Sequence, residues 1–146
     1  MIYLRKYGGG SKQNERRTLK SPVCLGNFVS QIADNQVQVK VSVARFVHHA
    51  PVHLWDFGVK ASESLSPGDV AYILCEDTLY YSTVFEKIAD PNGVIGDLVG
   101  WHRIQQAPWR NPIVLKPLVL LDALAPAVAL LSNKTTIEEN FFRLSV

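Results

Sequence analysis

The chain has 146 residues, of which 47% are hydrophobic and 19% charged, and it contains eight prolines and nine glycines. This size suits one turn-rich domain covering residues 1–146 and excludes two domains, while a net charge of +2 argues against a strong polyanion binder. No signal peptide precedes Arg5, the apolar run 118–131 is interrupted and too short to span a bilayer, and two cysteines give no disulfide framework. We therefore expect a cytoplasmic protein with no membrane partner.

Positive charge is concentrated at the start of the chain. Residues 1–20 hold six cations and one carboxylate, a local excess of +5, so that the remaining 126 residues sum to −3. This basic N-terminal segment is either a solvated, mobile arm or an arm that contacts phosphates. Within it, residues 3–7 suit an edge strand and the three glycines that follow suit a flexible break.

The next fifty residues show one helical and two extended patterns. Ser21-Pro22 is typical of a helix start, and apolar residues follow it with helical spacing up to Ile32. The clearest strand covers residues 36–43, because alternation with polar residues places four valines on one face: Val37, Val39, Val41 and Val43. Residues 52–57 resume an extended course, and 60–66 suit one or two helical turns.

A hairpin is predicted in the middle of the chain. Ser66-Pro67-Gly68-Asp69 is a strong turn signal, residues 70–75 form an apolar central strand, and residues 79–88 return after a tight turn. Beyond the turn at 90–93, residues 94–112 look irregular. A strand follows over 113–121, with Pro117 indicating an edge or a bulge.

The chain is expected to end in a helix over 132–146, since Thr135-x-x-Glu138 forms a capping box and Ile137, Phe141 and Leu144 give an apolar stripe. The total is five or six strands and two or three short helices. Because most strands are joined by hairpins, the predicted fold class is α+β, a small, mixed, partly open β-barrel with short flanking helices.

Three tryptophans carry the functional signal. Trp55, Trp101 and Trp109 each stand beside polar, cationic or turn-forming residues, outside the apolar runs. Core packing is the plain interpretation of each. The functional interpretation is that the three indoles converge into a pocket that stacks a planar ligand such as a nucleobase.

The order of these motifs resembles a known family. Leu54-Trp55-Asp56-Phe57, Pro67-Gly68-Asp69 with its buried strand, and Trp109-Arg110-Asn111-Pro112 are similar to EVE/YTH-like domains of the PUA superfamily over roughly residues 40–121. The resemblance implies a PUA-like barrel in which Trp55, Trp101 and Trp109 form an aromatic cage for a flipped, methylated base. Similar domains stand at the N-terminus of McrBC-type, modification-dependent restriction systems, which implies a downstream AAA+ GTPase motor and a nuclease subunit as partners.

The proposed pocket also needs polar groups. Asp56 and Asn111 are candidates for the base edge, although each is equally suited to stabilising a turn. The candidates for phosphate contacts are Lys60, Arg45, His102, Arg103 and Arg110, all of which also suit a solvated surface.

The sequence contains no complete motif for a metal site or a catalytic site. His48, His49 and His53 lack the cysteine or carboxylate that would complete a zinc site, so no metal or cofactor is predicted. No GxSxG elbow and no nuclease-type acidic motif is present, so we expect no enzyme.

The leading hypothesis is therefore a non-catalytic reader of methylated DNA, with 6-methyladenine ahead of 5-methylcytosine by family resemblance. The alternatives are an RNA-binding PUA-like domain, a small ASCH-like enzyme acting on nucleosides, and a protein-interaction module.

Overall fold

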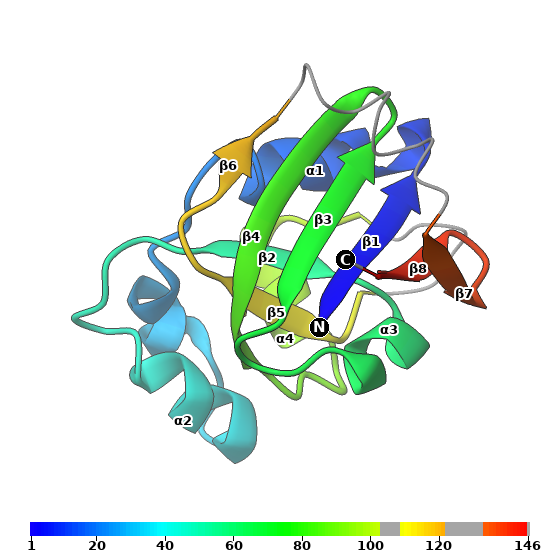
Figure 1. Cartoon of the computed structure of the whole chain (residues 1–146). Helices are drawn as coiled ribbons and strands as arrows, with labels where there is room; N and C mark the ends of the chain where they lie inside the picture. Colours follow the sequence, from blue (N-terminus) through cyan, green and yellow to red (C-terminus); the bar gives the residue numbers. More distant parts are fainter. Residues whose placement is uncertain (103–108, 122–132, 146) are drawn as a thin grey trace.

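The computed structural model describes residues 1–102, 109–121 and 133–145 (Figure 1). The strands are β1 (Ile2–Tyr7), β2 (His53–Asp56), β3 (Val70–Cys75), β4 (Thr78–Lys87), β5 (Pro112–Leu115), β6 (Val119–Leu120), β7 (Lys134–Glu138) and β8 (Phe141–Leu144). The helices are α1 (Lys12–Thr18), α2 (Val37–Ala44), α3 (Val59–Ser64) and α4 (Val94–Val99), with 3₁₀ turns η1 (Gly9–Ser11) and η2 (Leu25–Gln31).

The strands form one mixed, strongly curved sheet in the order β2-β5-β4-β3-β1-β8-β7, and β6 pairs with β4 beside this path. Within the described residues only β1 and β3 run parallel, and the end strands β2 and β7 do not pair with each other. The α+β class and the partly open sheet are thus as predicted. Eight strands and four α-helices in the described part exceed the predicted numbers, because several short elements carry weak local signals.

The first strand is not at an edge. β1 lies between β3 and β8, with Ile2 opposite Val70 on one side and Leu144 on the other. Nor is the basic segment 1–20 a mobile arm, because α1 packs onto the fold through buried Asn14, Glu15 and Thr18. Its cations Lys12, Arg16, Arg17 and Lys20 remain exposed.

The central hairpin forms where the sequence predicts it. The Asp69 carboxylate accepts the Ser66 N–H at 2.8 Å, and Gly68 takes a φ of +94°, which only glycine adopts without strain. β3 and β4 then pair in register from Val70 with Thr83 to Cys75 with Thr78.

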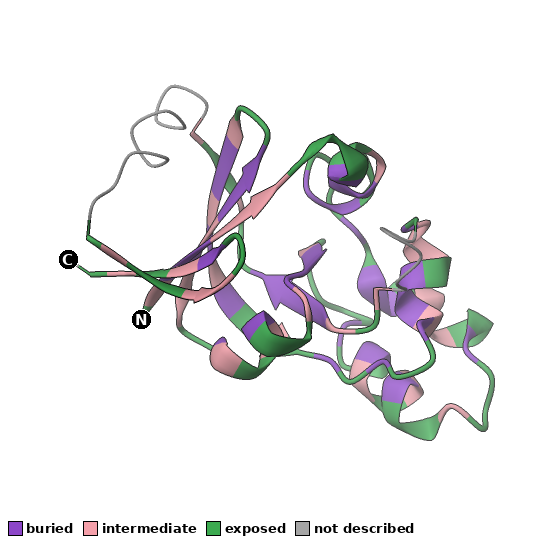
Figure 2. Ribbon diagram, turned by 90° about the vertical axis from the view of Figure 1, so that its right-hand side faces the viewer, coloured by how far each residue is buried: buried purple, intermediate pink, exposed green. Residues whose placement is uncertain are grey.

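The predicted valine strand is wrong, because these residues form helix α2. Val39 and Val43 are buried, while Val37 and Val41 are largely exposed. In a pattern of period two, every second apolar residue is four positions from the last, as Val39 is from Val43. Residues four apart lie on one face of a helix, so the same pattern also fits a helix with one buried side. α2 packs against η2, and Val39 and Val43 join Leu25, Ile32 and Phe46 in one buried cluster. Figure 2 shows that the helical segments carry both buried and exposed residues.

Alanine substitutions should separate these two arrangements. Val39 is 2% exposed and Val41 is 57% exposed. We expect Val39→Ala to lower the free energy of unfolding by about 2 kcal/mol, and Val41→Ala to change it by less than about 0.5 kcal/mol. Urea unfolding followed by circular dichroism measures both. Equal losses of stability in the two variants would favour the predicted strand, in which all four valines share one face.

The predicted C-terminal helix is also wrong. Residues 134–144 form the hairpin of β7 and β8, which turns at Asn140 with a φ of 62° and adds β8 to the free edge of β1. The run Thr135-Thr136-Ile137 is β-branched and suits a strand, and Phe141 is buried, stacking on Tyr3 with ring centroids 5.4 Å apart. The pairing of β8 with β1 stabilises the strand more than the capping box would stabilise a helix.

Two smaller differences concern residues 90–121. The stretch predicted as irregular contains α4, whose first turn is capped by Asp90 accepting the N–H groups of Val94 and Ile95 at 2.8 and 2.9 Å. The single strand predicted over 113–121 is divided into β5 and β6 around Pro117. No helix in the described part of the chain is long and apolar enough to cross a membrane.

The core consists of two main clusters on opposite faces of β2 and β5. Trp55 and Ile113 point into the first cluster, and their strand neighbours Leu54 and Val114 point into the second. Trp109 packs against both clusters. The short strands β2 and β5 therefore hold this tryptophan where the two halves of the core meet.

Candidate functional site

The three tryptophans come together in space. The Trp109 ring centroid lies 4.7 Å from that of Trp55 and 5.1 Å from that of Trp101, with interplanar angles of 83° and 69°. Trp55 is fully buried, Trp101 is 8% exposed, and Trp109 is half-buried. The indoles thus pack edge to face with one another, and Trp109 is the member that reaches the surface.

Trp101 is held in place from α1. Its indole N–H donates to Thr18 Oγ1 at 3.0 Å, and the Thr18 hydroxyl donates to the Leu54 carbonyl at 2.6 Å. The next residue, His102, exchanges two hydrogen bonds with the Asn14 side chain, at 2.7 and 3.0 Å. Helix α1 thereby fixes the start of the segment that leads to Trp109.

A hollow of about 520 Å³ opens beside Trp109, between β1, the β2–α3 turn and the β7–β8 hairpin. We call it the Tyr7 pocket. Tyr7 and Trp109 give it aromatic walls, with ring centroids 6.3 Å apart, and its polar lining includes Arg5, Asp56, Asn111 and Glu138. Three of the residues predicted for a binding site, Asp56, Trp109 and Asn111, therefore line one hollow.

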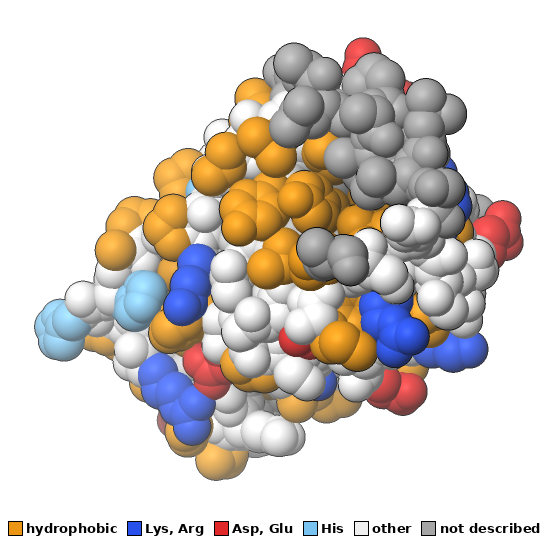
Figure 3. All heavy atoms as spheres, viewed as in Figure 1, with side chains coloured by type: hydrophobic (Ala, Val, Ile, Leu, Met, Phe, Trp, Pro, Cys, Tyr) orange, Lys and Arg blue, Asp and Glu red, His pale blue; other side chains and the backbone are white. Residues whose placement is uncertain are grey.

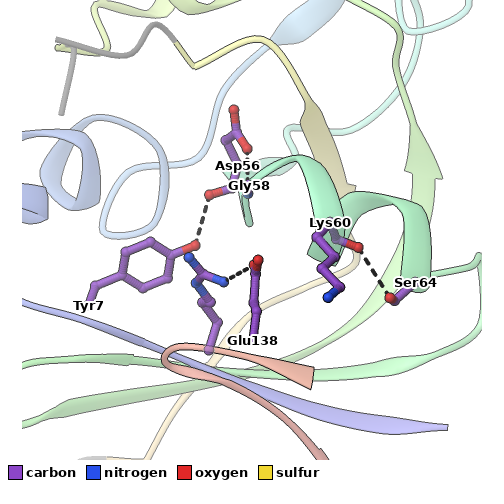
Figure 4. A network of polar contacts seen from close by, with 7 residues as sticks. Tyr7, Asp56, Gly58, Lys60, Ser64 and Glu138 are labelled. Carbon is purple, nitrogen blue, oxygen red and sulfur yellow. Dashed lines mark hydrogen bonds and ion pairs between the residues drawn. The ribbon is translucent and has the colours of Figure 1, made fainter. Parts of the chain in front are cut away.

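Asp56 organises the wall of this pocket. One carboxylate oxygen accepts the Gly58 N–H at 2.7 Å, and the Asp56 carbonyl accepts the Tyr7 hydroxyl at 2.8 Å (Figure 4). The other carboxylate oxygen accepts the Asn111 N–H at 3.1 Å. The turn-stabilising role suggested for Asp56 is confirmed by the Gly58 contact. Burial raises the pKa of the Asp56 carboxyl and, more strongly, that of the Tyr7 phenol. The phenol is therefore a neutral donor at physiological pH.

Arg5 and Glu138 form an ion pair in the same wall, with Nη1 and Oε1 2.5 Å apart. Their side chains are 20% and 29% exposed. The Arg5 Nε is buried and has no hydrogen-bond partner among the described residues, and the same holds for the Trp55 indole nitrogen. Unsatisfied buried donors of this kind are rare in folded proteins.

The predicted phosphate contacts are spread over several elements. Lys60 follows Val59, which lines the Tyr7 pocket, and Arg110 follows Trp109; both are exposed, as is His102. Arg45 is paired with Glu86 at 2.5 Å, so its charge is partly neutralised. Arg103 lies outside the described residues.

Two further surfaces were not predicted. A groove of about 780 Å³ lies between α1, η2 and α4, with Arg16, Arg17, Phe28 and Leu98 in its lining. An apolar area covers the outward face of β3, β4 and β6 (Figure 3), where Tyr72 packs against Leu74 and Leu79 and the side chains of Val119 and Leu120 are exposed.

The mixed, partly open sheet with its short flanking helices matches a PUA-like fold. No family model matches the chain, and no curated protein matches it. Among solved structures, the chain is similar to the N-terminal domain of McrB from Thermococcus gammatolerans, which was solved bound to m5C DNA. The match has a TM-score of 0.56 and 12% sequence identity, and it covers 82% of this chain and 75% of the other. The predicted resemblance to McrB N-terminal domains is thus confirmed at the level of the fold.

Proposed function

We propose that this domain binds DNA carrying a methylated base and holds that base, flipped out of the duplex, in the Tyr7 pocket. The observation that carries the proposal is the half-buried indole of Trp109, braced by two buried tryptophans at the rim of a hollow with polar walls. Its volume of about 520 Å³ falls within the roughly 300–1,000 Å³ usual for small-ligand sites.

The energetics support a pocket of this composition. Extruding a base costs a few kcal/mol, and stacking on an aromatic side chain returns about 1–3 kcal/mol per base. Trp109 and Tyr7 offer two aromatic surfaces, and the polar groups of the wall offer hydrogen bonds to the base edge. Stacking and edge contacts together offset the cost of extrusion.

We place 5-methylcytosine first and 6-methyladenine second, which reverses the order expected from the sequence. The solved structure with the similar fold was bound to m5C DNA, and this favours the pyrimidine. Under this proposal the domain has no catalytic role of its own, and it directs an AAA+ GTPase motor and a nuclease subunit to modified sites.

Phosphate contacts are assigned to Lys60, His102, Arg103 and Arg110. Arg45 is a weaker candidate because Glu86 already pairs with it. Three of these residues, Lys60, Arg103 and Arg110, are cations, so the binding constant for duplex DNA would fall steeply with salt, with a slope of about −3 on logarithmic axes.

A fluorescence titration tests the proposal. Duplexes that differ only in one adenine, 6-methyladenine, cytosine or 5-methylcytosine should quench the indole emission unequally, with 5-methylcytosine most effective. Trp109→Ala should weaken that binding by about 5- to 100-fold, corresponding to one lost stacking contact of about 1–3 kcal/mol. Because the substitution removes a fluorophore, anisotropy of a labelled duplex gives the affinity.

Phe85→Ala is the matched control, since Phe85 is a partly exposed aromatic residue that contacts Phe46 and His49, away from the pocket. It should leave the affinity unchanged. Equal binding of all four duplexes would contradict the proposal. Preference for structured RNA of equal length in competition would favour the RNA-binding alternative, and turnover of free nucleosides would favour the enzyme.

A further inference from the structure

We infer that Arg5 and Glu138 together read the edge of the flipped base and select 5-methylcytosine over thymine. The inference rests on the proposed function and adds the residues that determine its specificity.

A reader of 5-methylcytosine needs such a device because thymine carries the same methyl group. Stacking on Trp109 and contacts to the methyl group treat the two pyrimidines alike. They differ at the ring edge, where cytosine has an amino donor at position 4 and an acceptor at N3, and thymine has a carbonyl acceptor at position 4 and an N3–H donor. Selection must therefore come from hydrogen-bonding groups placed at these two positions.

The ion pair supplies one acceptor and one donor side by side. A carboxylate only accepts hydrogen bonds and a guanidinium only donates them. Among the described residues, the Arg5 and Glu138 side chains form one hydrogen bond, between Nη1 and Oε1, which leaves Arg5 Nη2 and the second Glu138 oxygen for a ligand, whereas Arg5 Nε is buried away from solvent. Glu138 can accept from the cytosine amino group while Arg5 donates to N3 or O2. Thymine in the same position would place its O4 against the carboxylate and its N3–H against the guanidinium. Two acceptors would then face each other, and so would two donors, and neither pair can form a hydrogen bond.

The pair is also in a suitable place. Both side chains line the Tyr7 pocket, and both are partly buried, which strengthens their hydrogen bonds. A Cβ built on Gly58 would lie 3.7 Å from Arg5 Nη2 and 3.9 Å from Glu138 Oε1, so glycine at this position leaves the pair uncovered. The other carboxylate of the wall, Asp56, already accepts one backbone N–H on each of its oxygens.

Glu138→Gln tests the inference, with Glu63→Gln as the control. Glu63 is an exposed residue of α3 that does not line the pocket and forms no ion pair with the described residues. The probes are duplexes whose central base is 5-methylcytosine, cytosine, thymine or 6-methyladenine, each opposite an abasic site so that base pairing does not enter. We expect the wild-type protein to prefer 5-methylcytosine to thymine by about tenfold or more.

In Glu138→Gln this preference should fall to about threefold or less, because a glutamine amide can also donate to the thymine carbonyl. Glu63→Gln should keep the wild-type ratio. Arg5→Lys, which retains the charge but loses the planar fork, should weaken 5-methylcytosine binding while its thermal unfolding by circular dichroism stays cooperative.

The outcomes separate the two proposals. If the wild-type protein does not distinguish 5-methylcytosine from cytosine, the proposed function fails and this inference fails with it. If 5-methylcytosine is preferred to cytosine but thymine binds equally well, or if Glu138→Gln leaves the thymine ratio unchanged in a folded protein, the function stands and the inference is wrong. Preference for 6-methyladenine over 5-methylcytosine would also overturn the inference.

Discussion

Trp55→Ala should lower the free energy of unfolding by about 3–5 kcal/mol, the usual cost of removing a fully buried large aromatic side chain. The Trp55 indole is completely buried and contacts Tyr7 and Trp109 edge to face, with ring centroids 5.1 and 4.7 Å away. Its removal leaves a cavity in the first core cluster. Since small domains have a total stability of about 5–15 kcal/mol, the loss is a large share of it. Urea unfolding followed by far-ultraviolet circular dichroism measures the change.

Trp109→Ala is the informative comparison, because Trp109 is half-buried. It should cost less stability than Trp55→Ala, about 1–2 kcal/mol, while producing the larger loss of DNA affinity in protein that is still folded. A Trp55→Ala protein as stable as the wild type, yet unable to bind DNA, would contradict this assignment and would make Trp55 a wall of the ligand site instead of part of the core.

Local sequence signals were sufficient for the elements formed by neighbouring residues. The turn at Ser66–Asp69, the apolar run of β3 and the return of β4 need only glycine at a positive φ, an aspartate that caps its own turn, and a tight hairpin. All three were predicted, because each depends on interactions within a few residues of the chain.

Elements whose form depends on distant partners were not predicted. Four alternating valines fit a strand as well as they fit α2, and packing against distant residues of the second core cluster decides which valines are buried. Likewise, the capping box at Thr135 is a fair helix signal until β1 offers an unpaired edge, and β8 then gains a ladder of hydrogen bonds that a short terminal helix lacks.

In the candidate site, too, features with a local sequence signal were predicted and features that depend on distant segments were not. The convergence of the three tryptophans was predicted, since each stood beside turn or polar residues. The open slot expected between all three indoles is not found, because Trp55 and Trp101 are buried and pack edge to face against Trp109. Tyr7, Arg5 and Glu138 were missed. Tyr7 and Arg5 lie in a segment expected to be an edge strand followed by a loose break, and Glu138 lies 133 residues from Arg5 in a segment expected to be helical. Nothing in the local sequence indicates that β7 and β1 are brought to the same pocket.

Thr18→Val should lower the free energy of unfolding by about 2–4 kcal/mol, although valine has nearly the same shape. Thr18 is fully buried, and its hydroxyl accepts the Trp101 indole N–H and donates to the Leu54 carbonyl. Valine leaves this donor and this acceptor buried without partners, and each unsatisfied group costs about 1–3 kcal/mol. β2 is an end strand of the sheet, so α1 supplies the partner that a further strand would otherwise provide.

Thr18→Ser is the matched control, because it keeps the hydroxyl and removes one methyl group. It should cost about 1 kcal/mol. The two variants should also differ in binding, since the Trp101 indole supports the ring of Trp109 and loses its hydrogen bond to residue 18 in Thr18→Val. A folded Thr18→Val protein should therefore bind 5-methylcytosine DNA more weakly than Thr18→Ser at a temperature where both are folded. Equal stability and equal affinity of the two variants would mean that the hydroxyl does not connect α1 to the tryptophan cluster, and that the pocket wall depends on packing alone.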